Sequence, residues 1–168
     1  MNANELRKSV ISKLSRSFNI EKEMSLGGIN YDFKGLFLEE TSKYILTKNL
    51  VYDSFSTKET IFYKTLEKRE KIIEKNQFKD YITKNLEVLK GTKENQMSSV
   101  ATFIFVGKKL SKIDENIIKR FSYHKSFLFG LKGWFNIKLI YIDLEGKKIL
   151  TNQFGKKDIN FFKSLITN

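Results

Sequence analysis

Apolar residues recur at helical spacing in four stretches of the chain. In residues 3–18 they fall at every fourth position, which predicts an amphipathic helix with one buried face. Similar stripes predict a helical region over residues 67–90, stopped by Gly91, and a short helix that begins after the N-cap residue Ser111. A final helix is predicted to begin at Asp158.

Strand patterns fill most of the remaining N-terminal half. Alternate aromatic residues predict a half-buried strand over residues 29–38, after a break at residues 27–28. Residues 43–55 and 59–66 predict two further strands, joined by a turn at residues 56–58. Because the connections are too short for a crossover, we expect the three segments to form an antiparallel meander.

The C-terminal half adds a central strand and a hairpin. Residues 99–106 form a continuous apolar run, which is typical of a strand buried on both faces. Residues 137–144 and 147–151 are predicted strands around a turn at Glu145–Gly146. The expected fold class is α+β: a mixed, largely antiparallel sheet of about five to six strands covered by helices. With no linker or repeat, residues 1–168 are expected to form a single globular domain.

Composition narrows the classes of protein that the chain can represent. Hydrophobic residues make up 40% and aromatic residues 14%, which argues against intrinsic disorder. Cysteine is absent and histidine occurs once, so disulfides and thiolate or histidine metal sites are not expected, nor is a cofactor. No apolar run is long enough to span a bilayer, and a cytoplasmic location is the default expectation.

Positive charge is concentrated toward the C-terminus. The net charge is +12, and residues 105–168 carry 13 basic and 5 acidic side chains, a difference of +8. Such asymmetry favours an anionic partner such as nucleic acid, an acidic protein or a lipid surface, although lysines also simply keep an aromatic-rich domain in solution. The lysines expected to form a binding patch are Lys125, Lys132, Lys138, Lys147, Lys148, Lys156 and Lys157.

The block of residues 123–134 concentrates the candidate chemistry, because it contains the only histidine and the only tryptophan. His124 is the candidate general base, with Tyr123, Ser98 and Ser126 as possible catalytic neighbours. The alternative is a histidine that only hydrogen-bonds the backbone at a helix end.

Trp134 beside lysines could stack on nucleic-acid bases. The alternative is that it is a buried anchor of the core.

Carboxylates on or near the first three predicted strands raise the alternative of a Mg²⁺-dependent nuclease. Their spacing does not match an Asp…Glu-x-Lys signature, so no metal ligand is assigned. These carboxylates are Asp32, Glu39, Glu40, Asp53 and Glu59.

Several short segments together resemble a known family. They are Met97–Ser99, Tyr123–Phe127, Phe129–Trp134, Ile142–Leu144, Thr151–Asn152 and Gly155–Lys156. The resemblance is to a family of small bacterial and archaeal proteins classed as a domain of unknown function, and it is densest over residues 97–157. It implies a shared architecture for residues 123–134 and no particular activity.

The leading hypothesis is a basic, noncatalytic binding module for nucleic acid or an acidic protein. The alternatives are an enzyme that uses His124 as general base, a nuclease-like hydrolase, and a protein inhibitor or adaptor. The sequence leaves the oligomeric state open.

Overall fold

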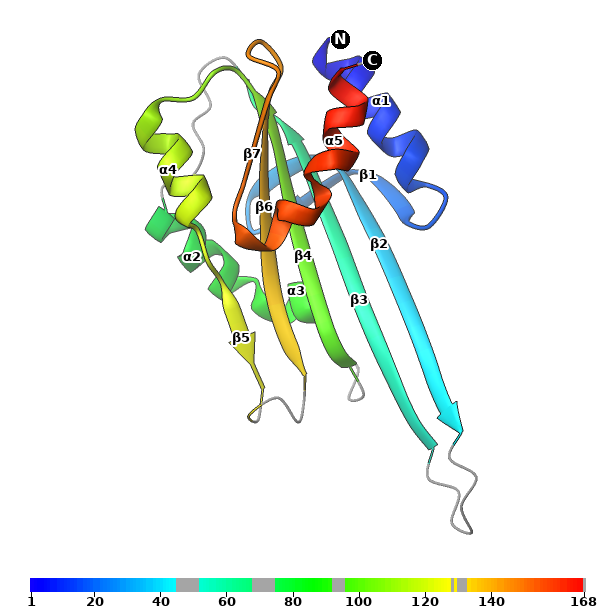
Figure 1. Cartoon of the computed structure of the whole chain (residues 1–168). Coiled ribbons are helices and arrows are strands. Elements are labelled where there is room, and N and C mark those ends of the chain that lie inside the picture. The colour runs from blue at the N-terminus through cyan, green and yellow to red at the C-terminus, as the bar shows by residue number, and fades with distance from the viewer. Residues whose placement is uncertain (45–51, 68–74, 92–95, 128, 130–132, 168) are drawn as a thin grey trace.

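A mixed β-sheet with helices on both faces forms the body of the molecule (Figure 1). The computed structural model describes residues 1–44, 52–67, 75–91, 96–127, 129 and 133–167. In chain order, the elements are α1 (Ala3–Leu14), β1 (Asn19–Leu26), β2 (Ile29–Tyr44), β3 (Tyr52–Thr65), α2 (Lys75–Lys84), α3 (Leu86–Lys90), β4 (Gln96–Gly107), α4 (Lys112–Arg120), β5 (His124–Ser126), β6 (Trp134–Asp143), β7 (Lys148–Thr151), the 3₁₀ helix η2 (Gln153–Asp158) and α5 (Ile159–Ile166). The predicted α+β class is confirmed.

Seven strands make up the sheet within the described residues, in the order β1-β2-β3-β4-β6-β5. The strand β7 also pairs with β6, beside the end of β6 that β5 does not reach. The β3–β4 and β4–β6 pairs are parallel and the other pairs are antiparallel. The sheet is therefore mixed and largely antiparallel, as predicted, with more strands than the five to six expected.

Helices cover the two faces of the sheet in separate groups. On one face, here the α1/α5 face, Leu6 and Val10 of α1 and Phe162 of α5 pack into one buried cluster. On the opposite face, α2, α3 and α4 cover a larger aromatic cluster that includes Phe78 and Phe103. Each face thus has its own apolar core, and both cores share the same strands.

The predicted central strand is confirmed. Residues 99–106 lie within β4, which has a parallel neighbour on each side. Phe103 and Phe105 point into one core, whereas Ile104 and Val106 point into the other. The run is continuously apolar because both faces of this strand are covered.

The N-terminal meander exists, but its boundaries differ from the prediction. The strand β1 was not predicted, and the predicted turn at residues 56–58 is wrong because these residues lie inside β3. The meander consists of β1, β2 and β3, joined first by a turn at Gly27–Gly28. Residues 45–51, in the middle of the predicted second strand, lie outside the described residues.

Several predicted helix boundaries are confirmed. The Ser111 hydroxyl accepts a hydrogen bond from the Asp114 backbone N–H at 3.2 Å and caps α4. The last helix begins at Ile159 after its N-cap residue Asp158, and Gly91 ends α3 with a positive φ of 85°. The predicted 67–90 helix is in fact two helices with Asn85 between them, and residues 68–74 lie outside the described residues.

One asparagine completes the outer edge of β6 between β5 and β7. The Asn152 side chain accepts a hydrogen bond from the Leu139 N–H at 3.1 Å and donates one to the Ile137 carbonyl at 2.8 Å. Its backbone N–H donates to the Leu139 carbonyl at 3.1 Å. Asn152 is fully buried, so water does not reach these groups. Its hydrogen bonds therefore satisfy the backbone of β6 where neither β5 nor β7 pairs with it.

The described ends of the chain lie close together. Helices α1 and α5 pack side by side on one face of the sheet, and the N and C labels are adjacent in Figure 1. None of the helices in the described parts of the chain has the length and apolar character needed to cross a bilayer.

Candidate functional site

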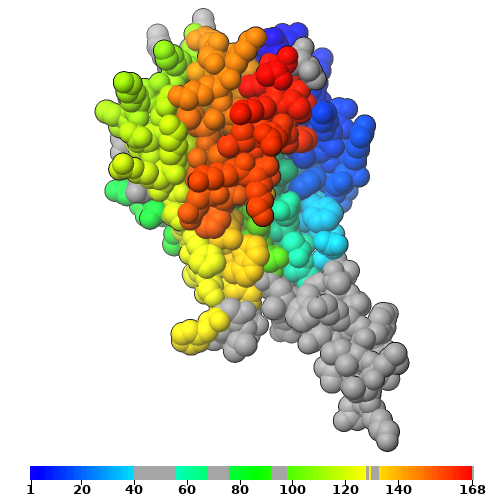
Figure 2. All heavy atoms as spheres, in the orientation of Figure 1, coloured from blue at the N-terminus to red at the C-terminus, as the bar shows by residue number. Residues whose placement is uncertain are grey.

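No helix of the described residues covers one part of the α1/α5 face. Figure 2 shows the C-terminal segment over one end of the strands, while the other ends of β4, β5 and β6 reach the surface. Side chains alternate between the two faces along a strand. Ile140 of β6 packs into the core under α5, so every second residue from Ile140, and the residues paired with them on neighbouring strands, lie on the α1/α5 face. We call this surface the open sheet half. Its residues are Thr57, Glu59, Ser98, His124, Ser126, Trp134, Asn136 and Lys138, with the buried Val100 and Thr102 between them on β4.

Strand register brings several predicted residues together on the open sheet half. Trp134 of β6 lies opposite Ser98 of β4 on one side and Ser126 of β5 on the other. His124 lies opposite Asn136, two positions further along β6. Four predicted residues from three strands, β4, β5 and β6, therefore share one small surface.

His124 is exposed and is oriented by Asn136. Its Nδ1 atom lies 2.6 Å from the Asn136 side-chain oxygen. In the neutral ring, Nδ1–H donates to this oxygen, and Nε2 is then left as an acceptor. In this tautomer Nε2 lies on the side of the ring away from Asn136.

Trp134 is neither a buried anchor nor fully exposed. Its side chain is 39% exposed, whereas its neighbour Phe135 is completely buried on the opposite face. The Ser98 hydroxyl donates to the Thr57 hydroxyl at 3.1 Å, so these two polar groups also lie on the surface next to Trp134. An aromatic ring thus lies among hydroxyl and amide groups on an uncovered sheet.

Lys138 carries a neutralised charge. Its Nζ atom lies 3.0 Å from Asp158 and 3.9 Å from Glu59, and its side chain is mostly buried. In contrast, Lys156 and Lys157 of η2 are exposed and make no ion pair with any described residue. The ion pair of Asp158 with Lys138 brings the end of η2 to the open sheet half, so among the described residues the lysines of η2 are the candidate cations there.

The other predicted lysines lie elsewhere. Lys125 projects from β5 on the α2–α4 face, where its Nζ lies 5.7 Å from the centre of the Phe127 ring. Lys147 and Lys148 lie at the far end of β6, and Lys148 makes an ion pair with Glu115. The positions of Lys125 and Lys148 along β6 are separated by about 26 Å of strand. Lys132 lies outside the described residues, and the described lysines do not form one continuous patch.

Tyr123 lies on the face opposite His124. Its ring packs edge-on against Phe135 with centroids 6.0 Å apart, and its hydroxyl lies 3.4 Å from the Thr83 hydroxyl. The structure therefore brings His124, Ser98 and Ser126 onto one face but leaves Tyr123 on the other.

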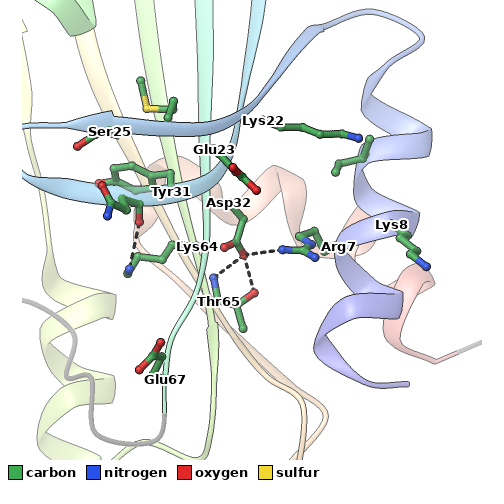
Figure 3. Close-up of a pocket in the computed structure, with 13 residues that line it drawn as sticks. Arg7, Lys8, Lys22, Glu23, Ser25, Tyr31, Asp32, Lys64, Thr65 and Glu67 are labelled. Carbon is green, nitrogen blue, oxygen red and sulfur yellow. Dashed lines mark hydrogen bonds and ion pairs between the residues drawn. The ribbon is translucent and has the colours of Figure 1, made fainter.

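A cleft far from residues 123–134 was not predicted from the sequence. It has a volume of about 1050 Å³ and lies between α1, the β1–β2 hairpin and the end of β3 (Figure 3). Charged side chains of both signs line it: Arg7, Lys8, Lys22, Glu23, Asp32, Lys64 and Glu67.

The Asp32 carboxylate organises the floor of the cleft. It accepts hydrogen bonds from the Thr65 N–H at 3.0 Å and the Thr65 hydroxyl at 2.7 Å, and it lies 3.8 Å from Arg7. No local sequence signal marks this site because its residues come from four separate elements.

The carboxylates considered for a nuclease site do not converge in the described part of the chain. Asp32 lies in the cleft and Glu59 lies on the open sheet half. No group of three or more described histidines, aspartates or glutamates is placed to hold a metal ion. The side chains of Glu40 and Asp53 lie outside the described residues.

The fold and both surfaces define the chain as an open α+β sheet protein with a polar sheet face and a charged cleft. The model of one family, described as a domain of unknown function (DUF8052), matches residues 2–164, and the chain belongs to this family. No curated protein and no solved structure matches the chain.

Proposed function

We propose that the protein is a noncatalytic binding module for single-stranded nucleic acid, and that the open sheet half is its binding surface. The observation that carries this proposal is the exposed Trp134 ring beside His124 on an uncovered sheet. Sheets that bind single strands use aromatic side chains on which bases stack, with cations nearby for the phosphates. A cytoplasmic location is part of the proposal.

Each group of the surface has a role in this proposal. Bases stack on Trp134 and on the His124 ring, whose plane is held by Asn136. Phosphates contact Lys156 and Lys157, which are exposed on η2, the element whose Asp158 pairs with Lys138. Lys138 contributes less because Asp158 and Glu59 already neutralise its charge.

Tryptophan fluorescence provides the first test, because Trp134 is the only tryptophan of the chain. Adding an unlabelled single-stranded oligonucleotide is expected to quench this fluorescence. With a fluorescently labelled oligonucleotide, Trp134→Ala is expected to weaken binding about 5- to 150-fold, the effect of one lost stacking contact. A matched control is Ile113→Ala, which removes an exposed apolar side chain on α4 and should leave the affinity unchanged. Equal affinities for wild type and Trp134→Ala would contradict the proposal.

Salt dependence tests the role of the lysines. Binding is expected to weaken steeply with salt, and the double variant Lys156→Gln/Lys157→Gln should reduce the slope of log K against log salt by about 1.4. The control double variant Lys109→Gln/Lys112→Gln removes two exposed lysines near α4 and should leave the slope unchanged. Competition by polyglutamate as strong as that by the oligonucleotide would instead favour an acidic protein partner, as in the inhibitor or adaptor alternative.

A second candidate function is RNA cleavage with His124 as general base. The contact with Asn136 favours it, because it leaves Nε2 of His124 free to accept a proton. In that reaction Nε2 would take the proton from a ribose 2′-hydroxyl as its oxygen attacks the phosphorus. The P–O5′ bond breaks, and the leaving 5′-oxygen takes a proton from water, which gives a 2′,3′-cyclic phosphate and a free 5′-hydroxyl. Incubation of a labelled RNA strand with wild type and His124→Ala tests it: the variant is expected to lose cleavage. Cleavage that survives in the variant rejects this role.

A further inference from the structure

The cleft between α1, the β1–β2 hairpin and β3 has the features of a small-molecule site. Its volume of about 1050 Å³ is at the upper end of the range usual for such sites. It lies at the opposite end of β3 from the open sheet half, since Thr57 and Thr65 are separated by about 26 Å of strand. Any ligand of the cleft is therefore distinct from a strand bound at Trp134.

Arg7 and two carboxylates of the cleft face a common space, and Lys22 and Lys8 lie at its lining. In Figure 3 the Arg7 guanidinium points from α1 toward Asp32, and Glu23 points from β1 into the same space. Arg7 donates to the Asn4 side chain at 2.9 Å and lies 3.8 Å from Asp32, so several of its five N–H donors have no partner among the described residues. Lys22 and Lys8 make no ion pair with any described residue. Positive charge is thus available to an incoming anion.

The carboxylates retain free acceptor oxygens. Both bonds from Thr65 reach Oδ2 of Asp32, which leaves Oδ1 without a hydrogen bond from the described residues. Glu23 has no hydrogen-bond or ion-pair partner among them either. Carboxylate oxygens beside cations suit a ligand that carries hydroxyl groups next to an anionic group.

Two further observations indicate that the cleft is more than a gap between elements. Glu23 has a positive φ of 53°, a conformation that a non-glycine residue adopts at a cost and that is frequent at functional sites. The Tyr63 hydroxyl, next to Lys64 in β3, is fully buried and has no hydrogen-bond partner in the described part of the chain. Burial and then the charge of nearby Asp32 raise the pKa of this hydroxyl.

We propose that the cleft binds a small phosphate ester of a sugar, with the phosphate on Arg7 and Lys22 and the sugar hydroxyls on Glu23 and Asp32. Lys8, at the rim, adds to the positive field around the phosphate. The two kinds of charge bind different parts of such a ligand. The cations hold the phosphate, and the carboxylates accept hydrogen bonds from the hydroxyl groups. Ribose 5-phosphate and a ribonucleoside monophosphate are two sources of this chemistry.

Calorimetric titration of the whole chain tests the proposal with four probes: ribose 5-phosphate, uridine 5′-monophosphate, inorganic phosphate and ribose. At least one ester is expected to bind about tenfold tighter than either fragment, and the comparison of the two esters shows whether the base contributes. Failure of both esters to bind at about 10 mM, or inorganic phosphate binding as tightly as the esters, overturns the proposal.

Variants locate the binding. Lys22→Gln removes an exposed charge and is expected to weaken ester binding about tenfold, as for the loss of one charge-assisted hydrogen bond. Lys79→Gln, an exposed lysine on α2 at the opposite face of the sheet, is the matched control and should bind as wild type. Wild-type affinity in Lys22→Gln overturns the proposal. Trp134→Ala should bind the ester as tightly as wild type does. A failure of ester binding to the cleft can therefore be distinguished from a failure of oligonucleotide binding to the open sheet half.

Discussion

Asn152→Ala is expected to lower the free energy of unfolding by about 2–6 kcal/mol. The change removes the partners of the Leu139 N–H and the Ile137 carbonyl, and both residues are buried. Each buried polar group left without a partner costs about 1–3 kcal/mol. The side chain also accepts a hydrogen bond from the Gly155 N–H at 3.2 Å, so η2 loses its cap as well. Urea denaturation followed by circular dichroism measures the loss.

Two control variants test whether the loss of stability comes from the hydrogen bonds of Asn152 or from any change in this segment. Gln153→Ala alters the exposed next residue and is expected to change the free energy of unfolding by no more than about 0.5 kcal/mol. Asn152→Asp keeps the oxygen that accepts from Leu139 but places a carboxylate oxygen against the Ile137 carbonyl. Relative to wild type, it should be more destabilised at pH 7 than at pH 4, where a protonated carboxyl can donate. A stable Asn152→Ala variant would mean that water reaches this edge of β6.

Phe103→Ala is expected to lower the free energy of unfolding by about 3–5 kcal/mol, the usual cost of removing a fully buried ring. Phe103 stacks on Phe62 with ring centroids 4.9 Å apart and meets Phe78 edge-on at 5.3 Å. Because β4 lies in the middle of the sheet, its neighbours on both sides limit how far the cavity can collapse. Thermal and urea denaturation both measure the effect.

Phe129 provides the matched control, because its side chain is fully exposed. Phe129→Ala is expected to leave stability within about 0.5 kcal/mol of wild type. Phe103→Leu keeps much of the buried apolar volume and should lose less than half as much stability as Phe103→Ala. Similar losses in Phe103→Leu and Phe103→Ala would show that ring stacking, and not buried volume, dominates this core.

Elements that are covered on both sides could be predicted from the sequence. The apolar run in β4 and the stripe in α5 follow directly from burial, and the Ser111 cap follows from its hydroxyl. The strand β1 was missed because it is an exposed edge strand with charged residues on consecutive positions, which conceals the alternation of a half-buried strand.

The error at residues 56–58 has a physical cause of interest for function. Polar residues in this part of β3 indicated a turn, but Thr57 and Glu59 are polar because they lie on the open sheet half. A strand with one uncovered face has a sequence that resembles a loop. The failed prediction and the candidate site therefore have the same cause: no helix of the described residues covers this part of the sheet.

The candidate residues could be named from the sequence, but their grouping could not. Nothing local shows that Ser98 and Ser126 flank Trp134, because this depends on the order and register of three strands. The cleft was not predicted at all, since α1 and β1 to β3 each contribute only a few of its residues.

The neighbouring ends of the chain have a practical consequence for any fusion or surface immobilisation. A tag or further domain attached at either terminus would emerge beside α1 and α5, at the opposite end of the sheet from β5. Tethering through either terminus would thus leave the open sheet half facing solvent. It would also place the attached polypeptide near Lys8, at the rim of the charged cleft.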